Sequence, residues 1–195
     1  MTSVSALNHI HKTGLFWNHE NKNEENLLKI SEIKNLLIIQ IVQYKNSTVS
    51  FENIDIDSLK LKNEPLSVVS NTDTRILWNG PKNWLLVSTK KDLLKNITEK
   101  FKETDFAVTD LSHSRAIIEI EGRDAKEVLK KGCPFNFNIL DKNNSINSTY
   151  NGIAFTADMI DNKPYKIRLF SLRSFGESFY HSISDSSLEF GYKAI

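Results

Sequence analysis

The sequence is poor in cysteine and nearly balanced in charge. Cys133 is the one cysteine among 195 residues, which excludes an internal disulfide and a thiolate metal cluster made by this chain alone and fits a reducing compartment. Basic and acidic residues number 25 and 24, for a net charge of +1. The sequence therefore provides no bulk electrostatic attraction for nucleic acid or for a membrane surface, and we expect neither as a partner.

Apolar leader segments and phosphate-binding glycine motifs are also missing. The first twenty residues contain His9, His11, His19 and Glu20 but no apolar run, so we expect no signal peptide or membrane anchor there and a cytoplasmic location. No GxGxxG follows a strand and no GxxxxGK[ST] is present, so the chain has no recognisable loop to cradle a dinucleotide or nucleotide phosphate. We identify no flavin site and expect no cofactor in this chain.

Hydrophobic residues make up 39% of the chain and charged residues 25%. At this length such a composition can bury a real core, in one domain or in two small fused halves. Residues 1–32 are polar and weakly patterned, which predicts an extended N-terminal arm rather than packed structure. Phe16 and Trp17 are the exception, and we expect these two aromatic residues to anchor the arm, on this chain or on a neighbouring subunit.

The rest of the chain, residues 33–195, shows alternating strand and helix patterns. Residues 36–44 are almost continuously apolar, which predicts a central strand buried on both faces. A hairpin is expected over 76–87, with its turn at Asn79 and Gly80. Residues 143–148 are expected to form a turn-rich connector. Further strands are expected at 54–61, 105–111, 116–121, 153–159 and 165–169.

Three main helices are expected from their capping signals. Asp124 is expected to cap a short helix. Thr89 with Asp92, and Ser174 with Glu177, have the spacing of capping boxes at the start of two longer helices. The resulting order is strands, helix, strands, helix, strands, helix. This order predicts an α+β fold with mostly antiparallel sheets.

Asp110, Ser112 and His113 are the strongest catalytic candidates, because the three residue types are those of a Ser-His-Asp triad. Neighbours in an extended chain point to opposite faces, however, so Ser112 and His113 cannot readily form the hydrogen bond between nucleophile and base. The favoured alternative is a turn in which Asp110 and Ser112 bond local backbone amides and His113 is structural. We therefore assign no catalytic residue.

Cys133 admits two interpretations. Lys130 and Lys131 lie nearby and would favour a reactive thiolate, whereas the end of a helix acts in the opposite sense. Its place between Gly132 and Pro134 favours a small buried residue at a turn.

A histidine pair and a tryptophan pair each have a functional and a structural interpretation. His9 and His11 have the spacing to share one face of a strand and bind a metal, but the sequence shows no third ligand, and no metal site is assigned. Trp78 and Trp84 flank the hairpin turn and are expected to pack across the two strands.

Two segments resemble a known family. Residues 75–87 read RILWNGPKNWLLV, and residues 110–136 contain DLSHSR, GRDAKEVL and KGCPFN. This succession resembles the aminomethyltransferase-like superfamily and, within it, the gamma-subunit family of heterotetrameric sarcosine oxidase. Residues 167–175, IRLFSLRSF, support the resemblance. It implies an aminomethyltransferase-like fold of two small α+β halves, with residues 33–195 as the gamma-subunit domain.

The resemblance also implies a function. It implies a non-catalytic subunit of a complex that oxidatively demethylates sarcosine to glycine, with hydrogen peroxide and formaldehyde or 5,10-methylenetetrahydrofolate as products. FAD, FMN, NAD and tetrahydrofolate are then expected in partner subunits, which are the alpha, beta and delta subunits. Whether the substrate is sarcosine or another N-methyl amine is not visible in this chain.

Two alternatives stay open. One is a stand-alone folate-binding protein or aminomethyltransferase-like enzyme of the same superfamily. Those chains are considerably longer, which disfavours this alternative. The other is a scaffold unrelated to sarcosine, since a fold does not dictate a function.

Overall fold

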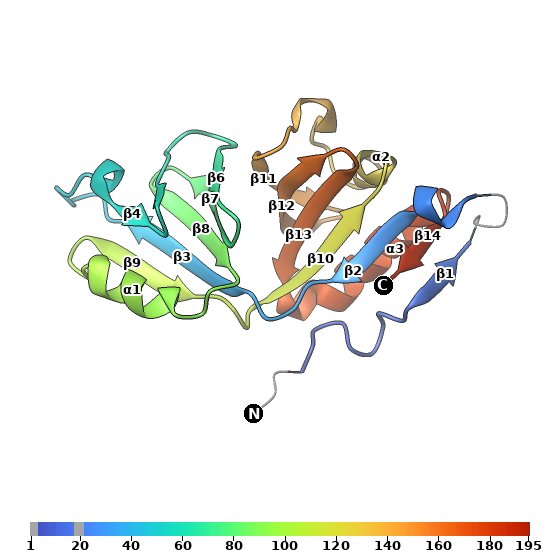
Figure 1. Ribbon diagram of the computed structural model, residues 1–195, viewed down its shortest axis with the longest axis horizontal. Helices are drawn as coiled ribbons and strands as arrows, with labels where there is room; N and C mark the ends of the chain where they lie inside the picture. Colours follow the sequence, from blue (N-terminus) through green and yellow to red (C-terminus); the bar gives the residue numbers. More distant parts are fainter. Residues whose placement is uncertain (1–3, 18–21) are drawn as a thin grey trace. The chain divides into compact units, whose positions relative to one another are not determined.

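The computed structural model describes residues 4–17 and 22–195 (Figure 1). The chain forms two compact units. Unit 1 contains residues 1–34, 114–142 and 146–195, and unit 2 contains residues 35–113 and 143–145. The expected α+β class, with two halves and mostly antiparallel sheets, is confirmed. No helix in the described residues is long and apolar enough to cross a bilayer.

Unit 1 is built on a seven-stranded sheet in which β10 lies at the centre, antiparallel to β2 and β13, while β14 runs parallel to β2. The strands, in their order across the sheet, are β1 (Gly14–Phe16), β14 (Tyr192–Ala194), β2 (Leu28–Glu32), β10 (Arg115–Glu121), β13 (Tyr165–Leu172), β12 (Ile153–Asn162) and β11 (Ser145–Tyr150). The helices of this unit are α2 (Ala125–Lys130) and α3 (Gly176–Ser187), with 3-10 turns η1 (Glu24–Asn26), η3 (Phe137–Ile139) and η4 (Arg173–Phe175).

Helix α3 packs on one face of this sheet. A Cβ built on Gly176 would lie 2.7 Å from the Cβ of Ala116, so only glycine allows this close approach. Because side chains alternate along a strand, Ala116, Ile118 and Ile120 face the helices, whereas Arg115, Ile117, Glu119 and Glu121 face away from them.

Unit 2 contains a five-stranded sheet in which β3 lies between β8 and β9, antiparallel to both. Its order is β6 (Val68–Ser70), β7 (Thr74–Gly80), β8 (Asn83–Ser88), β3 (Leu37–Gln43) and β9 (Phe106–Asp110). Helix α1 (Leu93–Lys100), the 3-10 turn η2 (Phe51–Asn53) and a small hairpin of β4 (Asp55–Ile56) and β5 (Leu59–Lys60) complete it. Trp84, Ile39, Leu86, Ile97 and Phe101 are among the residues that form its buried core. The expected central strand at 36–44 is confirmed.

The N-terminal residues differ from the expected extended arm. Leu7 is fully buried, β1 pairs with β14, and Phe16 stacks on Tyr192 with 4.9 Å between ring centroids. Trp17, by contrast, is 72% exposed. The described part of this segment therefore belongs to the sheet of unit 1, because β14 supplies a strand for it to pair with. Residues 1–3 and 18–21, including His19 and Glu20, lie outside the described residues.

Two expected elements also differ. Residues 54–61 form the small β4–β5 hairpin instead of one strand, because Asp57 and Ser58 adopt left-handed backbone angles, with φ of 51° and 64°, and reverse the chain. The expected connector at 143–148 instead leads into the strand β11, which pairs at the sheet edge.

The expected turns and caps are shifted locally. Gly80 still lies in β7, and the hairpin turn falls at Pro81 and Lys82, where Lys82 has a φ of 56°. Asp124 is the N-cap of α2 but makes no side-chain capping hydrogen bond, and the N-cap of α3 is Phe175 instead of Ser174. Thr89 Oγ1 donates to Asp73 instead of capping α1.

Candidate functional site

The turn that follows β9 brings Asp110 and Ser112 together. The Asp110 carboxylate accepts hydrogen bonds from the backbone N–H of Ser112 at 2.9 Å and from its hydroxyl at 2.6 Å. Ser112 Oγ in turn accepts the backbone N–H of Ile38, in β3, at 3.0 Å, and the N–H of Leu111 donates to the Ile38 carbonyl at 2.8 Å. The expected turn is confirmed for Asp110, whose carboxylate accepts a local backbone amide. Ser112 instead accepts the amide of Ile38, from the distant strand β3.

The electrostatics of this turn suit a structural carboxylate. Burial alone would raise the pKa of Asp110, but the hydrogen bonds from Ser112 and the charges of nearby His113 and Lys91 outweigh it and lower the pKa. An ionised Asp110 bonded directly to Ser112 occupies the position that the base would take in a triad. His113 is exposed, and no hydrogen bond found in residues 4–17 and 22–195 involves its ring. The geometry therefore contains no Ser-His pair.

The two N-terminal histidines are separated by their conformation. Residues 6–10 form turns rather than a strand, because the N–H groups of Ile10 and His11 both donate to the Leu7 carbonyl. The nitrogens of His11 lie 3.0 Å from the Tyr180 hydroxyl and 3.0 Å from the Ile195 carbonyl oxygen, while His9 is exposed. The described residues contain no group of three or more His, Cys, Asp or Glu side chains placed to hold a metal.

Cys133 and the tryptophan pair lie as expected. Cys133 is buried, and its thiol donates to the Ser148 hydroxyl at 3.3 Å. Trp78 and Trp84 are direct cross-strand partners in the β7–β8 hairpin.

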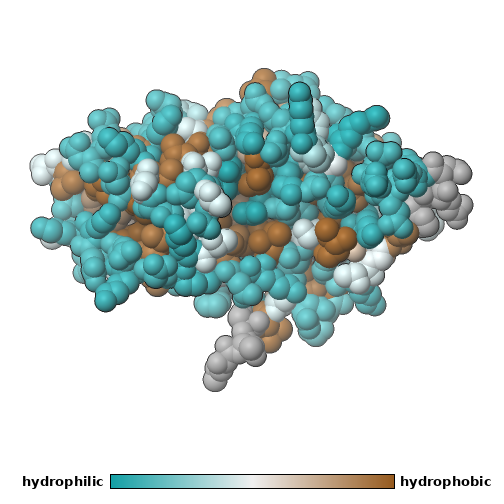
Figure 2. Space-filling view, viewed as in Figure 1, coloured by the Kyte–Doolittle hydropathy of each residue, from teal (hydrophilic) through white to brown (hydrophobic). Residues whose placement is uncertain are grey.

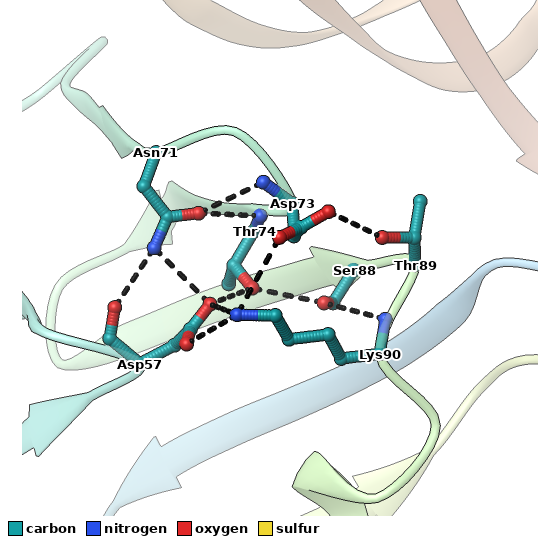
Figure 3. Close-up of polar contacts among 7 residues, drawn as sticks. All are labelled: Asp57, Asn71, Asp73, Thr74, Ser88, Thr89 and Lys90. Carbon is teal, nitrogen blue, oxygen red and sulfur yellow. Dashed lines mark hydrogen bonds and ion pairs between the residues drawn. The ribbon is translucent and has the colours of Figure 1, made fainter.

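A polar network that we did not expect from the sequence surrounds Asp57 (Figure 3). The Asp57 carboxylate accepts hydrogen bonds from Lys90 Nζ at 2.8 and 3.1 Å, from Thr74 Oγ1 at 2.7 Å and from Asn71 Nδ2 at 3.1 Å. The Thr74 hydroxyl also contacts the buried Ser88 hydroxyl at 2.8 Å. These contacts join the β4–β5 turn to β7 and to the end of β8.

The charges of this network are fixed at neutral pH. Hydrogen bonds from Lys90, Thr74 and Asn71 lower the pKa of Asp57 to about 2, and the hydrogen bond to Asp57 raises the pKa of Lys90. An efficient general base or acid has a pKa near the working pH. Asp57 and Lys90 are held far from that range, so the arrangement is suited to an ion pair that holds the small hairpin in place.

This network predicts a loss of stability in acid. Because its pKa is lower in the folded chain, Asp57 stabilises unit 2 fully above about pH 4 and loses that contribution as the pH falls towards about 2. We expect Asp57→Asn to lower the free energy of unfolding by about 1 kcal/mol near pH 6, after allowing for solvent screening. In denaturant unfolding, the difference in free energy of unfolding between Asp57→Asn and the wild type should disappear at about pH 2.

The matched control is Asp92→Asn. Asp92 is exposed and caps α1 without a side-chain hydrogen bond. The stabilising role of the Asp57 ion pair would be contradicted if Asp92→Asn lost as much free energy of unfolding as Asp57→Asn. It would also be contradicted if the loss for Asp57→Asn were the same at about pH 2 as near pH 6.

A row of ion pairs crosses the sheet of unit 1 on the face away from the helices, and we call it the charge ladder. Glu121 lies 3.2 Å from Lys29 in β2 and 2.6 Å from Lys166 in β13. Glu119 lies 2.8 Å from Arg168 and 3.9 Å from Lys166. The hydrogen bond from Lys166 lowers the pKa of Glu121, and the pKa of Lys166 is raised by the same bond. Each of these five charged side chains therefore has at least one partner of opposite charge within the ladder.

A cavity of about 420 Å³ lies near one end of the charge ladder, and its wall includes Lys29, Glu121, Gly122, Arg123 and Pro164. Four of its charged residues pair locally: Lys29 with Glu121 at 3.2 Å, and Arg123 with Asp124 at 3.6 Å. Lys22 and Glu25, also in the wall, add one charge of each sign. The wall therefore carries three basic and three acidic residues, a balance that favours neither an anionic nor a cationic ligand.

No known family model and no curated protein matches the sequence. Among solved structures, the chain is similar to a chain of the heterotetrameric sarcosine oxidase from Corynebacterium sp. U-96 in complex with pyrrole 2-carboxylate. The TM-score is 0.81 at 21% sequence identity, and the alignment covers 96% of this chain and 95% of that chain.

The chain is also similar to the glycine cleavage system aminomethyltransferase T from Bartonella henselae. The TM-score is 0.64 at 12% identity, and the alignment covers 97% of this chain but 58% of that chain. The expected aminomethyltransferase-like fold is therefore confirmed, and the resemblance to sarcosine oxidase holds at the level of the fold.

Proposed function

We propose that this chain is a non-catalytic structural subunit, of the gamma type, in a cytoplasmic complex of the heterotetrameric sarcosine oxidase kind. One observation carries the proposal: the fold matches a chain of such an oxidase with a TM-score of 0.81 over 96% of this chain and 95% of that chain. A fold alone does not define a function, so the features of the candidate sites are needed beside it.

The candidate sites support a structural role. Asp110 and Ser112 bond each other and the backbone of β3, and Asp57 and Lys90 hold each other as an ion pair. In this proposal the alpha, beta and delta subunits hold FAD, FMN, NAD and tetrahydrofolate. Those partners oxidise sarcosine, or another N-methyl amine, to the demethylated amine, and oxygen becomes hydrogen peroxide. The one-carbon unit leaves as formaldehyde or 5,10-methylenetetrahydrofolate.

The test is co-expression with affinity-tagged alpha, beta and delta subunits. We expect this chain to be retained in a stable complex whose flavin absorbance belongs to the partners, while the chain purified alone shows no flavin band and no oxidase activity. A chain that elutes alone from the co-expression, or that keeps flavin when isolated, would overturn the proposal.

A second candidate is a stand-alone folate-binding protein, favoured by the similarity to an aminomethyltransferase. Calorimetric titration of the isolated chain with tetrahydrofolate separates the two. Saturable one-to-one binding without partner subunits would favour the second candidate.

A further inference from the structure

Arg115 and Leu172 stand opposite each other at the end of the β10–β13 ladder. Both side chains lie on the face of the sheet that points away from α2 and α3, because the neighbouring Ala116 packs against Gly176 of α3. Direct cross-strand partners have Cβ atoms about 4.5 to 5.5 Å apart. The arginine and leucine side chains therefore leave the sheet from adjacent positions on this face.

Among the residues that the structure describes, Arg115 differs from the other cations of this face in having no carboxylate partner. Lys29, Lys166 and Arg168 each form an ion pair in the charge ladder. Arg115 forms none among residues 4–17 and 22–195, and its guanidinium contacts only the Ser114 carbonyl and hydroxyl, at 3.4 and 3.3 Å. It is half-buried, and burial lowers its pKa. A partly desolvated cation is costly unless an anion compensates it.

Leu172 gives this position an apolar component. It is 43% exposed, whereas the next pair along the same face, Ile117 and Phe170, is buried, with exposures of 5% and 2%. Hydrophobic residues reach the surface in several small areas on the face shown in Figure 2, so exposure alone does not identify a contact site. The combination with an uncompensated arginine does, since arginine beside apolar area is typical of the centre of protein interfaces.

We propose that Arg115 and Leu172 form a docking point for an acidic segment of a partner subunit, in which a carboxylate binds Arg115 and an adjacent apolar side chain covers Leu172. This inference rests on the proposed function and names the chemistry of the partner. The planar guanidinium suits two parallel hydrogen bonds to a carboxylate. An isolated small anion would satisfy Arg115 but would leave Leu172 exposed, which is why a protein segment fits better.

The experiment measures the dissociation constant of this chain for the co-purified alpha, beta and delta subunits, by surface plasmon resonance. We expect Arg115→Ala to weaken binding by about tenfold or more. Arg115→Lys should weaken binding to a lesser extent than Arg115→Ala, because an ammonium group keeps the charge but cannot form the two parallel hydrogen bonds. Leu172→Glu should also weaken binding, because it places a competing carboxylate beside Arg115. Raising the salt should weaken the wild type more than Arg115→Ala.

Arg123→Ala is the control, since the Arg123 side chain is 91% exposed and lies in the same unit. Melting curves of each variant distinguish the loss of a binding contact from the loss of the fold. If Arg115→Ala melts at a lower temperature than the wild type, Arg115→Lys becomes the informative variant, because it retains the alkyl part of the side chain. If the wild type forms the complex and both Arg115→Lys and Leu172→Glu bind with the same dissociation constant as the wild type, the docking point is overturned while the proposed function stands. Arg115 would instead bind a small anion if two results were found together. Phosphate or acetate would change the melting temperature of the wild type but not that of Arg115→Ala, and Arg115→Ala would assemble with the partners as the wild type does. If no wild-type complex forms, both proposals fail.

Discussion

Trp84→Ala is expected to destabilise unit 2 by about 3 to 5 kcal/mol, the usual cost of removing a fully buried aromatic side chain. Trp84 is 1% exposed and packs on Phe51 with 5.1 Å between ring centroids. Its indole N–H donates to the Lys62 carbonyl at 2.6 Å. The alanine leaves a cavity between β8 and η2 and removes a hydrogen bond that holds the segment before β6.

Trp78→Ala is the matched control, because Trp78 is the cross-strand partner of Trp84 in the same hairpin. It is half-buried, and its N–H donates to the Asn63 side chain at 3.2 Å, so we expect a cost of about 1 kcal/mol. Hydrogen exchange in denaturant, resolved over residues 37–43 and 83–88, would report the stability of unit 2 separately from unit 1. Equal costs for the two variants would contradict the burial difference.

Sequence patterns predicted the elements whose hydrophobic period is long and uninterrupted. The apolar run at 36–44 became β3, and the alternation at 116–121 became most of β10. The Asp110–Ser112 turn was also readable, because an aspartate two residues before its amide donor forms a local motif that needs no distant partner. These features depend on neighbours within a few residues.

The features that sequence patterns missed depend on distant partners. The residues of β2 follow a polar segment, and the local pattern predicts them as part of the extended arm. Leu28 and Ile30 are nevertheless buried, because β14 and β10 pair with β2 from far along the chain. Asp57 and Lys90 are likewise brought together by a turn at Asp57 and Ser58. An Asp-Ser turn at the middle of 54–61 was the one signal available for that site, and it gave no indication of the lysine.

Ser112→Ala and His113→Ala are expected to behave differently, although the two residues are adjacent. Removing the Ser112 hydroxyl leaves the N–H of Ile38 without its acceptor at the start of β3, and Ile38 is fully buried. We expect a loss of about 1 to 3 kcal/mol in the free energy of unfolding. His113 is exposed, so His113→Ala should change stability by no more than about 0.5 kcal/mol.

The same two variants test whether the turn takes part in catalysis. Assembled with the alpha, beta and delta subunits, both are expected to show wild-type turnover per flavin, since a structural turn does not touch the reacting atoms. Loss of a nucleophile or a general base typically lowers the rate by about a hundredfold or more with little effect on stability. Flavin-normalised turnover beside thermal melts is the measurement. A fall of about a hundredfold for His113→Ala with an unchanged melt would make His113 catalytic and end the structural assignment of the turn.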